Sequence, residues 1–248
     1  MMAVVLAGGY GRRLWPITRD IAKPLLPVAG RPVVDYLMEK FLPLKDCLNR
    51  IIVLTNSRFK GQFEDWAMRW TKLNVEVVSD GSSNEYEKPG AVGALAKIAH
   101  MVGEDFLVVA GDCIYEDDLA GFIESFKSKR LTTVGVYQAE YVSQVKRGSS
   151  VLLGQDNRII AFVEKPEAPL SWLVGAVVYA FPLRIKDRIV EYAGLGLPKD
   201  EPGRLIEWLH RVEPVYGYML KGSVWDIGTP ESYGEAEKYV RRLVGRFG

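Results

Sequence analysis

The chain has 248 residues, enough for one large domain or two small ones at roughly 150 residues per domain. Its 32 Lys and Arg residues nearly balance 31 Asp and Glu residues, so the formal charge of +1 gives no general attraction to nucleic acid or to an acidic membrane. Hydrophobic residues make up 48% and charged residues 25%, which excludes overall disorder and indicates a globular protein with a large core.

Cysteine and histidine usage excludes two further classes. Cys47 and Cys113 are too few for a disulfide framework, and the only histidines, His100 and His210, leave no spacing typical of a zinc site. The apolar N-terminus lacks a basic leader, and the longest apolar stretch, Leu173–Phe181, is far shorter than the roughly 18 residues that span a bilayer. We therefore expect a cytoplasmic protein without a membrane partner.

The first half alternates strand and helix patterns. Apolar, β-branched runs predict strands at Met2–Ala7, Ile51–Thr55, Val75–Ser79, Phe106–Ala110 and Thr132–Gln138. Helical patterns lie between them at Val33–Leu42, Phe59–Trp70, Ala91–Met101 and Leu119–Lys129. This alternation predicts an α/β fold in which a Rossmann-like, mostly parallel sheet is flanked by helices, with ligand-facing loops after the strands.

After about Tyr141 the pattern becomes mixed. Strands are expected at Ser150–Leu153, Ile159–Val163, Leu173–Ala180 and Val215–Leu220, and helices at Arg184–Tyr192 and Arg204–Val212. Thr229 and Pro230 predict the N-cap and first residue of a last helix. Without an internal repeat or linker, we expect one domain over 1–248 with two lobes, at about 1–111 and about 112–248.

The segment after the first strand carries the clearest functional pattern. Gly8, Gly9 and Gly11 allow bare N–H groups to approach a phosphate, and Arg12 and Arg13 add positive charge. The alternative is a glycine-rich turn with solvated arginines. A dinucleotide fold is disfavoured because prolines prevent a helix before about Val33, and a P-loop sequence is absent. A long basic loop over residues 8–32, without secondary structure, remains.

These residues resemble a known family. The run Gly8-Gly9-Tyr10-Gly11-Arg12-Arg13-Leu14-x-Pro16-x-Thr18, followed by Lys23-Pro24-Leu25-Leu26-Pro27-Val28, is similar to the signature of sugar-1-phosphate nucleotidylyltransferases, the NDP-sugar pyrophosphorylases. Thymidylyl-, uridylyl- and guanylyltransferases of hexose 1-phosphates belong to this family. Arg12 departs from the pattern, where threonine is usual.

The resemblance assigns expected roles in this loop. Arg13 would hold the leaving phosphates, and Lys23 would reach the reacting phosphate. The expected nucleotide-binding residues are Leu6, Ala7, Gly8, Gly9, Gly11, Arg12, Glu85, Pro89, Gly90 and Asp112. Of these, Pro89 and Gly90 belong to a run, 87–95, that resembles the family's glycine turn beside the base. A plain helix-capping glycine turn is the alternative there.

Two carboxylates are candidate metal ligands. Asp112 follows a buried strand, and its alternative role is to stabilise a turn. Trp225-Asp226-Ile227-Gly228-Thr229-Pro230 matches another family motif, although Asp226 could merely support the cap at Thr229. Mg²⁺ prefers hard oxygen ligands, so the resemblance implies one magnesium ion shared by Asp112 and Asp226.

The resemblance also implies that the first half, about 1–111, binds the nucleotide and that the second half, about 112–248, forms a smaller mixed lobe that binds the sugar phosphate. Phe162-Val163-Glu164-Lys165-Pro166 matches the family's Glu-Lys-Pro motif, in which Glu164 accepts from sugar hydroxyls and the catalytic Lys165 holds the phosphate. As an isolated tripeptide it would be a surface charge pair. Gly148 and Gly175 are the expected sugar-side glycines. Val174 stands where many relatives have a polar residue.

The expected reaction joins a nucleoside triphosphate and a sugar 1-phosphate to give an NDP-sugar and pyrophosphate, with Mg²⁺ as cofactor. Three alternatives stay open: a cytidylyltransferase for inositol phosphate or a choline-type phosphate, a non-catalytic regulatory relative that binds nucleotide sugars, and, last, a dinucleotide-dependent oxidoreductase. The resemblance is compatible with a homo-oligomer. The base and the sugar are not assigned by the sequence.

Overall fold

In the computed structural model, which describes residues 1–244, the chain divides into two compact units. Unit 1 comprises residues 1–4, 89–109 and 117–223, and unit 2 comprises residues 5–88, 110–116 and 224–244 of the described chain. Strands β1 (Met2–Leu6) and β6 (Phe106–Ala110) each begin in unit 1 and end in unit 2. The expected single domain with halves 1–111 and 112–248 stays a prediction.

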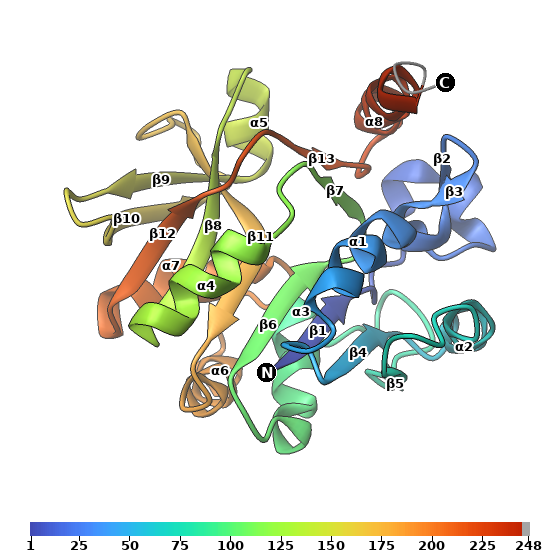
Figure 1. The fold of residues 1–248 in the computed structure, drawn as a ribbon, viewed down its shortest axis with the longest axis horizontal. Helices are drawn as coiled ribbons and strands as arrows, with labels where there is room; N and C mark the ends of the chain where they lie inside the picture. The colour runs from blue at the N-terminus through green and yellow to red at the C-terminus, as the bar shows by residue number, and fades with distance from the viewer. Residues whose placement is uncertain (245–248) are drawn as a thin grey trace. The chain divides into compact units, whose positions relative to one another are not determined.

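The central element is a seven-stranded sheet (Figure 1). Unit 1 supplies β12 (Val215–Met219), β8 (Thr132–Gln138), β11 (Leu173–Phe181) and β6 in that order. In unit 2, β4 (Arg50–Thr55) runs parallel to β5 (Val75–Ser79). Strand β11 is antiparallel to both of its neighbours, β8 and β6, whereas β12 is parallel to β8. The expected α/β class with a mostly parallel sheet flanked by helices is confirmed.

Unit 2 contains three helices besides its strands: α1 (Val33–Phe41), α2 (Lys60–Ala67) and α8 (Pro230–Val244). Two short ribbons complete it. One pairs β2 (Pro27–Val28) with β3 (Arg31–Pro32), and the other pairs β7 (Cys113–Tyr115) with β13 (Val224–Asp226) in antiparallel register. As predicted, Thr229 caps the last helix, since its Oγ1 accepts a hydrogen bond from the Ser232 N–H at 3.2 Å.

A compact apolar cluster joins the distant segments of unit 2. Its buried members are Leu14, Leu26, Val28, Val33, Ile114, Ile227, Ala236 and Val240. They come from the segment between β1 and α1, from α1, from β7, from the turn between β13 and α8, and from α8. Burial of these side chains therefore fixes the glycine segment against the β7–β13 ribbon.

Unit 1 builds a mixed layer with five helices: α3 (Ala91–Lys97), α4 (Ala120–Lys129), α5 (Val142–Arg147), α6 (Ile185–Gly194) and α7 (Pro202–Val212). A hairpin of β9 (Ser149–Leu153) and β10 (Ile159–Glu164) extends from it, and α7 packs on β10 while α4 packs on β8 (Figure 1). Among the helices of the described residues, none has both the length and the apolar content that a bilayer crossing requires.

The loop over residues 8–32 differs from the expectation. It is not without secondary structure, because one-turn 3₁₀ helices form at Arg12–Leu14, Ile17–Arg19 and Lys23–Leu25 before the β2–β3 ribbon. Prolines exclude a longer α-helix but allow single 3₁₀ turns, and the first α-helix begins at Val33 as predicted. Helix α5 and the β7–β13 ribbon were not predicted, because short elements carry little periodicity.

The apolar cluster generates a stability prediction. We expect Ile227→Ala to lower the free energy of unfolding by about 2–5 kcal/mol, because Ile227 is fully buried and its removal leaves a cavity. Urea unfolding measures this change. Ile21→Ala is the matched control, since the Ile21 side chain is 42% exposed, and an equal loss in both variants would contradict the role of the cluster.

Candidate functional site

The glycine segment, residues 8–11, follows β1. Its backbone conformation requires glycine at some of these positions and not at others. Gly11 has φ 63°, and a Cβ there would lie 3.0 Å from the Thr18 side chain, whose Oγ1 donates to the Gly11 carbonyl at 2.7 Å. Around Gly9, no atom lies within 4 Å of a Cβ position, so its backbone is open to a ligand. The start of the segment is held by two backbone hydrogen bonds: the Leu6 carbonyl accepts from the Gly111 N–H at 2.9 Å, and the Ala7 N–H donates to the Leu54 carbonyl at 2.8 Å.

The two arginines that follow have different surroundings. The Arg12 guanidinium lies over the rings of Trp15 and Tyr86, with centroids at 5.5 and 5.7 Å. Arg13 is exposed and, within the described chain, has neither an ion pair nor a side-chain hydrogen bond. Arg13 therefore presents a free guanidinium, whereas Arg12 is held by aromatic side chains.

The residues near the expected base contacts belong partly to unit 2 and partly to unit 1. In unit 2, Glu85 pairs with Lys88 at 2.6 Å, and the Ser82 hydroxyl shares a hydrogen bond with Tyr10. In unit 1, Gly90 has φ 76°, and a Cβ there would lie 2.5 Å from the Lys199 backbone. Pro89 lies against Gly93 in the same turn. Gly90 is the N-cap residue of α3, and the close approach of the Lys199 backbone requires a glycine there, while its role beside a base stays a prediction.

Unit 2 brings together three charged side chains that lie far apart in the sequence. Lys23, on the third 3₁₀ turn, has its Nζ 2.5 Å from Asp112 Oδ2 and 3.3 Å from Asp226 Oδ1. Asp112 lies between β6 and β7, and Asp226 ends β13. The β7–β13 pairing places Asp226 opposite Cys113, so the ribbon itself brings the carboxylates together.

The electrostatics of this cluster favour a lysine cation. Burial acts to lower the pKa of Lys23, but the Asp112 and Asp226 carboxylates outweigh it, and the pKa lies above its ordinary range. Burial, reinforced by the same carboxylates, raises the pKa of the Cys113 thiol well above its usual value. Lys23 is therefore an ammonium ion and Cys113 a neutral thiol at physiological pH.

The cluster fits a divalent cation by two observations. The ligand atoms of Asp112, Cys113 and Asp226 lie within 4.8 Å of one another, and the carboxylate oxygens are the hard donors that Mg²⁺ prefers. Moreover, a cationic group, the Lys23 ammonium, already lies between the two carboxylates. Asp226 also supports the turn before α8, since its Oδ2 accepts from the Gly228 N–H at 2.9 Å, so both interpretations of Asp226 are compatible.

Unit 1 gathers the expected sugar-side residues at the β9–β10 hairpin. The Lys165 N–H donates to the Gly148 carbonyl at 2.7 Å, and Glu164 pairs with Ser149 across the hairpin. The Gly175 N–H donates to the Ser149 hydroxyl at 2.9 Å. A Cβ on Gly175 would lie 2.7 Å from the Phe162 ring, so close packing requires glycine there.

Two residues that sequence reasoning missed hold this cluster. A Cβ on Gly203, in the first turn of α7, would collide with the Glu164 carboxylate, which therefore lies against that helix N-terminus. Glu201, the N-cap residue of α7, binds the Lys165 ammonium at 2.5 Å. A single sequence carries no signal for either contact, because both depend on how α7 packs on β10.

Among the carboxyl groups of unit 1, Glu164 has the pKa that departs furthest from its ordinary value. It is 9% exposed, and its carboxylate has no hydrogen bond within the described residues. Burial raises the pKa of Glu164 to about 7, against the opposing effect of Lys165. The group is therefore poised between its neutral and charged forms near neutral pH.

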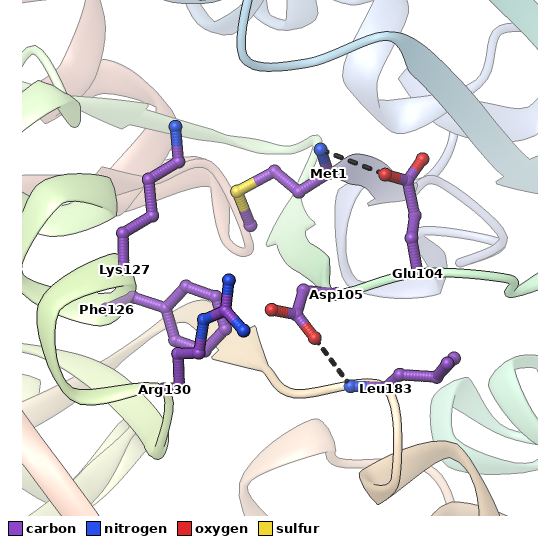
Figure 2. A pocket seen from close by; sticks show the side chains of 7 residues that line it. All are labelled: Met1, Glu104, Asp105, Phe126, Lys127, Arg130 and Leu183. Carbon is purple, nitrogen blue, oxygen red and sulfur yellow. Dashed lines mark hydrogen bonds and ion pairs between the residues drawn. The ribbon is translucent and has the colours of Figure 1, made fainter.

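A separate cavity of about 480 Å³ lies in unit 1, lined by Met1, Glu104, Asp105, Phe126, Lys127, Arg130 and Leu183 (Figure 2). Its acidic groups are engaged. Glu104 pairs with the N-terminal amine at 3.1 Å, and Asp105 accepts from the Leu183 N–H at 2.9 Å. None of the residues expected to bind substrate lines this cavity.

The raised pKa of Glu164 predicts a pH-dependent stability. Between its ordinary value of 4.5 and about 7, the folded state binds more protons than the unfolded state, so the free energy of unfolding falls as pH rises through this window. Glu164→Gln should remove this loss. The free energy of unfolding of the variant, relative to wild type, should therefore be up to about 3 kcal/mol higher at pH 8 than at pH 5. Urea unfolding at both pH values tests this, with exposed Glu167→Gln as control. An unchanged pH dependence in Glu164→Gln would refute the assignment.

Comparison with known proteins assigns the chain to a family. It is 30% identical over 240 residues to the bifunctional protein GlmU of Methanocaldococcus jannaschii, and the aligned region covers 97% of this chain and 54% of that protein. It is 29% identical over 238 residues to mannose-1-phosphate guanylyltransferase of Mycobacterium tuberculosis, covering 93% and 62%. The chain thus spans little more than half the length of these relatives.

The fold has solved counterparts. The crystal structure of a UDP-glucose pyrophosphorylase complexed with UDP-glucose superposes with a TM-score of 0.80 at 18% sequence identity, over 98% of this chain and 100% of that chain. A family model described as nucleotidyl transferase matches residues 2–242. The expected resemblance is thereby confirmed, and this chain belongs to the nucleotidyl transferase family.

Proposed function

We propose that the protein transfers a nucleotidyl group from a nucleoside triphosphate to a sugar 1-phosphate, giving an NDP-sugar and pyrophosphate. The Lys23–Asp112–Asp226 cluster carries the proposal, because it places a buried cation and two convergent carboxylates in the unit that also holds the glycine segment. Family membership and relatives named as sugar-phosphate enzymes support it. The near-neutral charge supports small phosphorylated partners rather than nucleic acid.

The reaction needs orientation and charge neutralisation rather than a covalent protein intermediate. A phosphate oxygen of the sugar 1-phosphate attacks the α-phosphorus in line, the new P–O–P linkage forms, and the bond to the β-phosphate breaks as pyrophosphate leaves. Asp112 and Asp226 would hold Mg²⁺, which when bound neutralises phosphate charge. The remaining groups that orient the substrates and neutralise their charge are side chains and backbone N–H groups of the protein.

Each group of unit 2 has a distinct proposed task. The open backbone at Gly9, with Gly8 and Gly11 beside it, lets N–H groups approach the phosphates. The free Arg13 guanidinium binds the leaving pyrophosphate, and Lys23 contacts the reacting phosphate. Preorganised cations stabilise the charge that develops in the transition state, which is the main source of rate.

In unit 1, Lys165 binds the phosphate of the acceptor, and Glu164 accepts hydrogen bonds from its hydroxyls. The carboxylate of Glu164 is suited to this task because it is already positioned at the α7 N-terminus. Within the described residues, its oxygens accept no hydrogen bond and are therefore available to a ligand. Glu201 orients the Lys165 ammonium. Gly148 and Gly175 shape the hairpin that carries them.

The overall reaction is tested by pyrophosphate release from a panel of nucleoside triphosphates and acceptors, including inositol and choline phosphates. We expect release with a sugar 1-phosphate, and Asp112→Asn should lower kcat by about 10²–10³-fold through loss of charge at the phosphates. Asp118→Asn is the matched control, because Asp118 is exposed and its carboxylate accepts from the Ala120 N–H at the start of α4. Absence of release from folded wild type with every pair, or wild-type rates for Asp112→Asn, would contradict the proposal. Release with CTP and a non-sugar phosphate alone would favour the cytidylyltransferase alternative.

The acceptor role of Lys165 has its own test. Lys165→Met should raise KM for the sugar 1-phosphate by at least about tenfold with little change in KM for the triphosphate, because a charge-assisted contact to one substrate is lost. Lys186→Met serves as control, since Lys186 binds the Val102 carbonyl instead. Steady-state kinetics with each substrate varied in turn measures both constants, and an equal rise in both KM values would count against the assignment.

A further inference from the structure

The cation between Asp112 and Asp226 is supplied by the chain itself. The Lys23 ammonium contacts one oxygen of each carboxylate, and Lys23 is only 8% exposed. The remaining oxygens are also engaged: Asp226 Oδ2 accepts from the Gly228 N–H, and Asp112 Oδ1 lies 3.8 Å from the Cys113 thiol. In the protein without ligands, Lys23 therefore neutralises the carboxylates that a metal would use.

We propose that Lys23 and the divalent cation exchange: the ammonium holds the carboxylate pair in the metal-free protein, and metal binding expels it. The proposal rests on the proposed function, in which Asp112 and Asp226 bind the metal. The two cations compete because they use the same carboxylate oxygens and repel each other over a few ångström. The metal site is therefore closed by a side chain rather than preformed and open.

The local structure allows this exchange without a change of fold. The backbone around Lys23 is fixed on both sides, since the Ala22 N–H donates to Gln62 Oε1 at 3.0 Å and Leu26 is fully buried in the apolar cluster. The ammonium, by contrast, sits at the end of a flexible four-carbon stem. Release requires only rotation of this side chain. The expelled cation is then available to a phosphate, so metal binding and lysine availability are coupled.

Because of this competition, the apparent affinity for a free cation equals the intrinsic affinity multiplied by the fraction of molecules in which Lys23 is released. If that population is about 10% or less, Lys23→Met should bind Mn²⁺ at least about tenfold more tightly than wild type. Isothermal titration calorimetry or the electron paramagnetic resonance of free Mn²⁺ measures this in the absence of nucleotide. Lys40→Met is the matched control, because it removes another lysine of unit 2, whose ammonium donates to the Glu116 carbonyl at 3.1 Å. Its Mn²⁺ affinity should equal that of wild type.

A second measurement on wild-type protein follows Lys23 directly and does not depend on the folding of a variant. Acetylation by an amine-reactive ester, mapped by mass spectrometry, should rise several-fold at Lys23 on addition of Mn²⁺, while Lys40 is unchanged. Simple charge repulsion, without release of the side chain, predicts no such rise.

Two results would overturn the exchange: Mn²⁺ binding by folded Lys23→Met that is equal to or weaker than wild type, or Lys23 acetylation that does not respond to Mn²⁺. Pyrophosphate release from the same preparation separates this failure from failure of the proposed function. Release without exchange refutes only the exchange. Absence of both release and any Mn²⁺ binding that is sensitive to Asp226→Asn would refute both.

Discussion

The structure of unit 2 depends on one buried charge. The Lys23 ammonium lies 89 residues from Asp112 and 203 residues from Asp226 along the chain, yet it contacts both carboxylates. A buried cation without partners is costly, so any arrangement that separated these three segments would leave a charge uncompensated. The 3₁₀ turn at Lys23–Leu25, the connection between β6 and β7, and the end of β13 are therefore tied to one another electrostatically as well as by packing.

Apolar packing determines where these charges meet. Leu26 lies three residues after Lys23, Ile114 two residues after Asp112, and Ile227 one residue after Asp226, and all three belong to the same buried cluster. The β7–β13 ribbon adds backbone hydrogen bonds that fix the carboxylate-bearing strands in register. The hydrophobic effect thus brings the segments together, and the charged side chains, which lie one to three residues from a cluster member in each segment, meet beside the cluster.

Steric constraints dominate in unit 1. Gly90, Gly175 and Gly203 each face a neighbouring group that a Cβ would overlap. At Gly203 that neighbour is the Glu164 carboxylate itself, so one small residue in α7 determines the position of a candidate substrate-binding group in β10. The same contact buries Glu164 and raises its pKa, which links packing directly to the protonation state of the site.

Local patterns were sufficient to predict the α/β class, the long strands such as Phe106–Ala110 and Thr132–Gln138, the start of α1 at Val33 and the cap at Thr229, because periodicity, proline and capping act over a few residues. Motif resemblance also indicated Asp112, Asp226, Glu164 and Lys165, although their roles stay proposals. The folded chain was needed to find that Lys23 lies between the two aspartates, that Glu201 binds Lys165 and that Gly203 accommodates Glu164. These are contacts between segments distant in sequence, and their geometry follows from packing, which no local pattern encodes.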